Sequence, residues 1–223
     1  MQPRPDHVLI EASGVALPGA IASSIGLLQG YALDGVTVLA DAETVRERTT
    51  DTYMGDTVRQ QLDQADVIVL NKTDLIQPPR RTDLLEWLAR DYGTAKTVEA
   101  EHAALPLSIA LGIARPDPPN LATAAFDHSR LFSTASYPID VPLDPEHLAR
   151  ALVTDDLGII RAKGFIKAPD GRLHELQIVG RRWTVRPAET ATTVGIVCIG
   201  PKSLFNEARI AATIAHHTHG ALE

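Results

Sequence analysis

Four polar residues that can bind a purine base, Asn71, Lys72, Thr73 and Asp74, directly follow the apolar run at residues 67–70. The carboxylate of Asp74 can accept two charge-assisted hydrogen bonds in a fork, and guanine offers such a donor pair, N1–H and the exocyclic amine, whereas adenine does not. The amide of Asn71 can reach the other edge of the ring and tie the loop together, while the aliphatic stem of Lys72 can lie along the face of the base. The spacing therefore predicts a guanine-reading loop, with an ordinary strand-to-helix turn capped by Asp74 as the alternative.

Two carboxylates lie upstream at the ends of short apolar runs. Residues 7–10 are predicted to form a short buried strand that ends at Glu11, and residues 36–40 a second strand that ends at Asp41. In P-loop nucleotidases an acid at a strand end holds Mg²⁺ or its water, and a glycine three residues later, as Gly14 follows Glu11, brings a backbone N–H to the γ-phosphate. Glu11 and Gly14 are therefore candidate contacts to Mg²⁺ and phosphate, and Asp41 is a weaker candidate. The alternatives are a solvated loop acid and a turn glycine.

A phosphate-cradling loop is missing from the 223 residues. Such a loop needs the pattern G-x-x-x-x-G-K-[ST], because successive backbone N–H groups wrap the phosphates and the hydroxyl binds Mg²⁺. The sequence contains no such string and no Gly-Lys pair, and Lys163-Gly164 has the reverse order. Because catalysis of phosphoryl transfer is mostly positioning and electrostatics, we expect no measurable GTPase activity from this chain alone.

The order of these segments resembles that of the CobW family of metal-associated P-loop GTPases. The resemblance rests on residues 10–18, residues 33–41, and residues 60–66 leading into residues 71–75, and it continues through residues 129–200, which resemble the C-terminal domain of that family. It implies an α/β fold, in which a partial P-loop-type parallel sheet is followed by a smaller α+β domain. It also implies a GTP-dependent metallochaperone, or the insertion of a metal into a client metalloprotein, with GTP or GDP, Mg²⁺, and Zn²⁺ or another divalent transition metal as cofactors.

Two functional classes remain open on this resemblance. In the family a Cys-rich motif lies between the phosphate loop and the segment that corresponds to Glu11 and Gly14, and both parts would lie before Met1, so we expect an N-terminally truncated member. In the first class the chain is a GTP-binding protein of metal homeostasis. In the second it is a non-catalytic module that binds a client or partner and is completed by another polypeptide. The open sheet edge expected of such a chain favours pairing with that polypeptide or self-association into a homo-oligomer.

Composition excludes several other classes. The net charge of −7 and the pI near 5.6 argue against a nucleic-acid-binding surface, which needs clustered cations. No apolar run approaches the ~18 residues needed to span a bilayer, and the proline-rich start lacks a signal-peptide core, so we expect a cytoplasmic protein without membrane contact. The single cysteine, Cys198, rules out an intramolecular disulfide and a Cys-cluster metal site, and its apolar surroundings predict a buried strand thiol.

The pattern of elements divides the chain in two. Residues 1–115 are predicted to form the partial nucleotide-binding domain, residues 116–127 a proline-rich linker, and residues 128–220 the C-terminal α+β domain, in which an antiparallel sheet carries helices on one face. The elements expected in the first part are strands at 7–10, 36–40 and 67–70 and helices at 18–29, 57–64 and 82–91. Those expected in the second part are strands at 129–141, 159–167, 173–179 and 194–199, a helix opened by Asp144 and Pro145, a hairpin at 168–171, and a final helix at 202–216 that turns Leu204, Phe205, Ile210 and Ile214 inward.

Two features of the second part could bind ligands or partners. Arg161 and Lys163 lie on one face of a predicted strand, where they could meet an anionic partner such as the nucleotide-binding domain, or simply face solvent. At the end of the chain, His216 and His219 are three residues apart on a continuing helix and could share one zinc, nickel or cobalt ion, with His217 directed elsewhere. Weak, adventitious metal binding is the alternative for these histidines.

Overall fold

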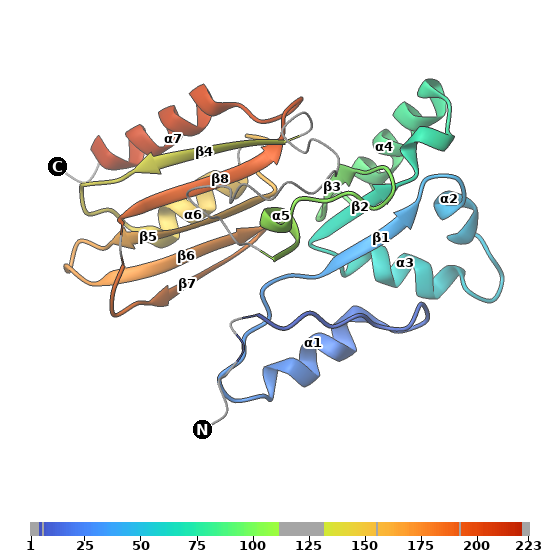
Figure 1. Ribbon diagram of the computed structural model, residues 1–223, viewed down its shortest axis with the longest axis horizontal. Coiled ribbons are helices and arrows are strands. Elements are labelled where there is room, and N and C mark those ends of the chain that lie inside the picture. The colour runs from blue at the N-terminus through green and yellow to red at the C-terminus, as the bar shows by residue number, and fades with distance from the viewer. Residues whose placement is uncertain (1–4, 6, 112–131, 155, 192, 220–223) are drawn as a thin grey trace, which may run out of the picture.

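The computed structural model describes residues 5, 7–111, 132–154, 156–191 and 193–219, and it contains two separate sheets (Figure 1). One is a three-stranded parallel sheet and the other a five-stranded sheet whose neighbouring strands are antiparallel. The predicted α/β class, with a parallel sheet followed by an α+β part, is thereby confirmed. The linker predicted at residues 116–127 lies outside the described residues.

The parallel sheet has the order β1-β2-β3, with strands Thr37–Asp41, Val67–Asn71 and Lys96–Glu99. The four residues before Asn71 in β2 are all buried, as expected of a central parallel strand covered on both faces. Ile68 and Leu70 face a core that includes residues of α3 (Gly55–Asp63) and α4 (Pro78–Asp91). Val67 and Val69 face the opposite way, into a cluster shared with the second part of the chain.

Four shorter elements complete the described residues of the first part: helices α1 (Pro18–Gly26), α2 (Val45–Arg48) and α5 (Leu107–Leu111), and the 3₁₀ helix η1 (Thr73–Leu75). The helices predicted at 18–29, 57–64 and 82–91 correspond to α1, α3 and α4. Helix α4 begins four residues earlier than predicted because Pro78 and Pro79 fit its first turn, where a helix needs no N–H partner. Within the described ranges, no helix is both long and apolar enough to cross a bilayer.

The buried strand predicted at residues 7–10 is wrong. These residues are neither a strand nor buried, and Val8, Leu9 and Ile10 are 56%, 80% and 51% exposed. An apolar run becomes a buried strand only if a neighbouring strand satisfies its backbone and a second layer covers its side chains. Strand β1 pairs only with β2 among the described residues, so no neighbouring strand is available there to pair with residues 7–10.

The second sheet has the order β4-β8-β5-β6-β7. Its strands are Phe132–Pro138, Gly195–Pro201, Arg161–Lys167, Leu173–Val179 and Arg182–Pro187, in that order. Helices α6 (Pro145–Thr154) and α7 (Glu207–His219) pack on one face, and Leu148, Leu152, Ile210 and Ile214 join a core that contains Cys198. Asp144 caps α6 as predicted, because its carboxylate accepts hydrogen bonds from the backbone N–H groups of Glu146 (2.9 Å) and His147 (3.2 Å).

Two expectations for this part need correction. Strand β7 was not among the predicted elements, since Arg182, Arg186 and the partly buried residues between them hide the alternation of an edge strand. Leu204 does not turn inward: it is 61% exposed and lies in a turn in which its N–H donates to the carbonyl of Pro201. The helix begins only at Glu207, after Asn206, whose side chain accepts from the N–H of Arg209 (3.0 Å).

The two sheets contact each other through an apolar cluster and two buried arginine contacts. Val67, Val69 and Val98 of the parallel sheet share a cluster with Ile160, Val179 and Ile199, and Ile109 of α5 joins them. Figure 1 shows α5 lying between the two sheets. Arg161, which is only 5% exposed, pairs with the carboxylate of Asp34 and donates to the carbonyl of Ile109 (3.1 Å). Through Arg161, the interface therefore joins β5 to the segment that precedes β1 and to helix α5, which follows β3.

Candidate functional site

The carboxyl ends of the three parallel strands place the predicted guanine-reading residues at one edge of the sheet. Strand β2 ends at Asn71, and the chain then turns sharply, because Lys72 adopts a left-handed conformation with φ of 63°. Thr73 is buried, and its hydroxyl donates to the carbonyl of Ala100 (3.2 Å) just beyond β3. This hydrogen bond anchors the loop to the chain that follows β3, and Asp74, in η1, is exposed to solvent.

Asp74 is exposed and has no hydrogen bond or ion pair among the described residues. The alternative role, a cap on the next segment, is not what the structure shows. The residue before η1 is Lys72 and the residue before α4 is Gln77, and neither element has a side-chain cap at its start. Both carboxylate oxygens of Asp74 are thus open to a ligand with two adjacent donors.

Asn71 ties this loop to the loop after β3. Its side-chain oxygen accepts a hydrogen bond of 2.8 Å from the backbone N–H of Ala103, and this leaves the side-chain NH₂ group as a donor. His102 and Ala103 both have left-handed backbones, with φ of 52° and 54°. The sequence argument predicted that Asn71 would tie the loop together, and the structure identifies Ala103 as the partner.

The loop at residues 101–104 is the part of the site that the sequence reasoning missed. Two of its residues have positive φ, but the loop contains no glycine, so its composition does not predict this left-handed backbone. Strand β3 before it is only four residues long. The usable signal was topological, because the loop that follows a neighbouring parallel strand must lie at the same edge of the sheet.

Lys72 links the loop at residues 71–74 to the end of β1. Its Nζ lies 2.6 Å from the Oδ2 of Asp41, which is paired with Asn71 in the register of the two strands. The hydrogen bond from Lys72 lowers the pKa of Asp41 and raises the pKa of Lys72 itself. The aliphatic stem of Lys72 therefore spans the distance between the two strand ends, and Asp41 joins the site as an orienting residue.

Glu11 and Gly14 lie outside this cluster. Glu11 is exposed, and no hydrogen bond or ion pair within the described part of the chain joins either residue to the loop at 71–74. The segment is held instead by α3, because the side chain of Gln61 donates to the carbonyls of Gly14 (3.0 Å) and Ala16 (2.9 Å). Glu11 and Gly14 are thus apart from the loop that contains Asn71, Lys72 and Asp74.

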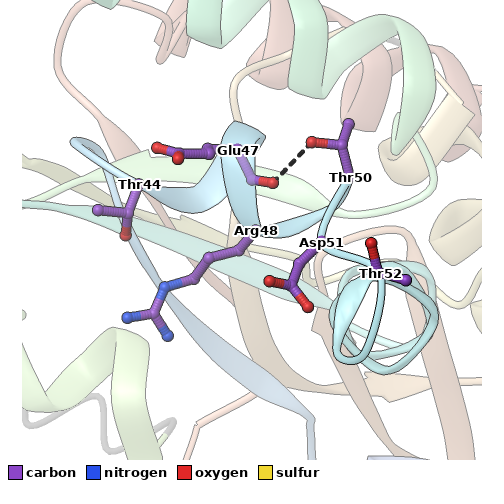
Figure 2. A pocket seen from close by; sticks show the side chains of 6 residues that line it. All are labelled: Thr44, Glu47, Arg48, Thr50, Asp51 and Thr52. Carbon is purple, nitrogen blue, oxygen red and sulfur yellow. Dashed lines mark hydrogen bonds between the residues drawn. The ribbon is translucent and has the colours of Figure 1, made fainter.

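A polar hollow of about 440 Å³ lies beside α2, and Figure 2 shows its lining side chains. The lining consists of Thr44, Glu47, Arg48, Thr50, Asp51 and Thr52. The backbone N–H groups of Met54 and Tyr53 lower the pKa of Asp51, so this carboxylate is ionised at neutral pH. Two acids against one arginine make the hollow a poor site for a phosphate chain, which needs several N–H donors or cations.

The predicted metal pair, His216 and His219, is only partly described. Helix α7 continues to His219, as the prediction requires, and His216 is exposed, but the side chain of His219 lies outside the described residues. His217 does not point away from other histidines, because its ring contacts the rings of His147 and His216. Among the side chains that the structure describes, no group of three or more His, Cys, Asp and Glu residues is arranged to hold a metal ion.

The two cations of β5 have different partners. Arg161 meets the anionic partner that the sequence suggested, since Asp34 belongs to the nucleotide-binding part. Lys163 pairs across the sheet with Glu175 (3.0 Å), so it supports the strand pairing rather than an external ligand.

Comparison with known proteins relates both parts of the chain to one family. Residues 1–99 match the family described as "CobW/HypB/UreG, nucleotide-binding domain", and residues 132–216 match "Cobalamin synthesis protein cobW C-terminal domain". The chain belongs to the CobW family. The two matches occur in the family's order and together cover both sheets of the structure.

The individual relatives share less than a third of their residues with this chain over the matched segments. The chain is 28% identical over 133 residues to a protein named "Zinc chaperone CobW" from Sinorhizobium sp, and this match covers 49% of the chain. It is 28% identical over 104 residues, 45% of the chain, to "Zinc-regulated GTPase metalloprotein activator 1" from Schizosaccharomyces pombe. The matched segments span 38% and 25% of the length of these two relatives. Among solved structures, the Zn(II)-bound YjiA GTPase from E. coli is similar with 24% identity and a TM-score of 0.39, over 92% of this chain and 68% of that one.

Proposed function

We propose that this CobW-family chain binds guanine nucleotides through the loops at residues 71–74 and 101–104 and acts in metal homeostasis, as a metallochaperone or in metal insertion into a client metalloprotein. The observation that carries the proposal is the presentation of Asp74, an exposed and unpaired carboxylate among the described residues, on a loop anchored by Thr73 and by the bond from Ala103 to Asn71. The names of the two curated relatives, one a zinc chaperone and the other a zinc-regulated GTPase, favour zinc as the metal.

The described residues fit the base of the nucleotide better than its phosphates. Asp74 would accept the N1–H and amine protons of guanine, the amide of Asn71 would donate toward the other edge, and the stem of Lys72 would pack on the ring. Glu11 offers one oxygen ligand, whereas Mg²⁺ takes six ligands and is usually shared with the nucleotide's phosphates. Mg²⁺ and the γ-phosphate are therefore assigned to Glu11 and Gly14 only as the family resemblance implies.

Titration of the ¹⁵N-labelled 223-residue chain with guanosine, GDP, GTP and ADP tests the base-reading site. We expect the amide signals of Thr73, Asp74 and Ala103 to shift with the three guanine ligands and not with ADP. Because the 223 residues contain no phosphate loop, guanosine and GTP should bind within a fewfold of each other, with dissociation constants of about a millimolar. Asp74→Ala should abolish the shifts, and Asp63→Ala, which removes an exposed carboxylate from α3, should not.

Hydrolysis is a separate question with a separate assay. We infer that the purified chain does not turn over GTP, because nothing among its residues matches the motif that positions the phosphates. Release of inorganic phosphate by the purified chain that disappears in Asp74→Ala would overturn this inference without affecting base recognition.

A second candidate function is a partner-binding module completed by another polypeptide, and it is favoured by the edge of β1, which has no neighbouring strand among the residues that the structure describes. Leu39 of β1 is 63% exposed, and Val8, Leu9 and Ile10 add exposed apolar surface in the same part of the chain. Open edges and apolar patches of this kind pair with other strands. Light scattering of the purified chain distinguishes the outcomes: a monomer that stays monomeric at high concentration argues against this candidate, and association that Leu39→Lys reverses supports it.

A further inference from the structure

Two histidines from different helices meet on the outer face of the second part. His147 lies in the first turn of α6 and His217 near the end of α7, and the two helices pack side by side. Their ring centroids are 5.3 Å apart with an interplanar angle of 85°. The ring of His216 approaches His217 from another side, with centroids 5.6 Å apart. Imidazole rings 70 residues apart in sequence are thus held within reach of each other by the packing of the two helices.

One ring is already oriented as a metal ligand would be. The Nδ1 of His217 lies 2.8 Å from the backbone carbonyl of Thr213. Because a carbonyl oxygen only accepts, Nδ1 must carry the proton, and Nε2 is left with a free lone pair. A histidine that binds a metal through one nitrogen usually donates its other N–H to such a carbonyl, which fixes the tautomer and the ring orientation.

The distance between the rings suits a shared ion. Two imidazole nitrogens at ~2.1 Å from one tetrahedral metal place their ring centroids roughly 5 Å apart. His147 is exposed, and the torsion that turns its ring is broad, so its nitrogen can swing toward the Nε2 of His217 without movement of either helix.

We propose that His147 and His217 are the two protein ligands of a transition-metal site on the α6–α7 surface. Imidazole ligands suit zinc, nickel, cobalt and copper, and with two protein ligands the remaining positions are open to water or to a ligand from a partner. Such a site binds and releases its ion readily, as transfer to another protein requires. The biological meaning of the site rests on the proposed role in metal homeostasis, whereas the site itself is testable on the purified chain.

Titration of the purified chain with Co²⁺ and with Zn²⁺, followed by calorimetry and by the visible absorption of bound Co²⁺, tests the proposal. We expect one ion per chain, and at least a tenfold loss of affinity in His147→Gln and in His217→Gln. His7→Gln removes an exposed histidine from the other part of the chain and should leave the affinity unchanged. Circular dichroism of each variant checks that the fold is kept.

Two outcomes would overturn the proposal. If His147→Gln binds as the original chain does while His216→Gln loses binding, the ion is held by the end of α7 alone. If His7→Gln loses as much affinity as the other two variants, the binding is adventitious. A measurement on the unmodified chain covers a variant that does not fold: Zn²⁺ should shift the imidazole ¹H–¹³C signals of His147 and His217 together, and unshifted signals refute the site. None of these readouts requires guanine binding, so the two proposals fail separately.

Discussion

Replacing Arg161 by methionine should uncouple the two sheets of this protein. The guanidinium is buried, pairs with Asp34, and donates to the carbonyl of Ile109 in helix α5, which follows the loop at residues 101–104. Methionine keeps most of the apolar contact area but removes every one of these donors. The Oδ1 of Asp34 is buried and has no hydrogen-bond partner, and its Oδ2 accepts from Arg161. The substitution therefore removes the hydrogen bond to Oδ2 as well.

The cost follows from the burial of the two partners. Breaking a fully buried ion pair costs about 3–5 kcal/mol, since the remaining charge is left uncompensated. The side chain of Asp34 is 36% exposed, so water can replace part of what it loses, and we expect about 2–3 kcal/mol for Arg161→Met. For a chain of 223 residues this lowers the melting temperature by about 5–10 °C. Asp34→Ala should cost at least as much, because it leaves the more deeply buried guanidinium unpaired.

The two tryptophans allow each part to be followed separately. Trp87 packs in the core beside the parallel sheet and Trp183 against the core of the second sheet, so Trp87→Phe and Trp183→Phe variants each report on one part by fluorescence. In denaturant, we expect the two reporters to unfold together in the parent chain and at different midpoints after Arg161→Met. The matched control is Arg181→Met, which removes an exposed arginine from the turn between β6 and β7. Equal effects of the two methionine substitutions, or coincident transitions in both, would refute the reasoning.

Three further predictions concern groups elsewhere in the structure. The hydrogen bond from Lys72 lowers the pKa of Asp41 below its usual value of 3.8, so the stability that Asp41 contributes is present above pH 3.8 and is lost as the pH falls through the lowered pKa. Burial raises the pKa of Asp66, so the stability that Asp66 contributes is lost as the pH rises through the raised pKa. Carboxyl ¹³C titration checks both directions. Burial raises the pKa of the Cys198 thiol to about 12, so a thiol reagent should label it only on unfolding. Gly180→Ala should destabilise the chain by about 2–3 kcal/mol, because φ is positive and the new methyl would collide with the carbonyl of Asp66. Gly171→Ala has a positive φ but open space around the new methyl, so it should cost about 1 kcal/mol. Denaturant unfolding measures both costs.

Local patterns predicted much of the fold correctly. The continuous apolar run at 67–70 predicted a buried strand of a parallel sheet. The Asp144-Pro145 pair predicted the start of α6, because a capping carboxylate and a proline act within a single turn. The polar residues at 71–74 predicted a loop at the carboxyl end of a strand, and the structure places them there. In each case the forces that decide the structure act between residues close in sequence.

Features that depend on distant partners were not predictable in this way. Residues 7–10 have the composition of a buried strand, but burial requires a neighbouring strand that no local pattern supplies. The partner of Arg161 is 127 residues away, and the contact of His147 with His217 depends on how α6 and α7 pack. The left-handed backbone of His102 and Ala103 follows from the hydrogen bond to Asn71 rather than from residue type.

The central claim, that Asp74 reads guanine, is tested most directly by exchanging the base and the residue together. Xanthine carries a carbonyl where guanine carries its amine, so an amide at position 74 can donate to xanthine but cannot accept both guanine donors. Calorimetric titration of the original chain and of Asp74→Asn with GDP and xanthosine diphosphate provides the measurement. The account predicts that the substitution weakens GDP binding at least tenfold and strengthens binding of xanthosine diphosphate. Unchanged preference for GDP in Asp74→Asn would contradict it.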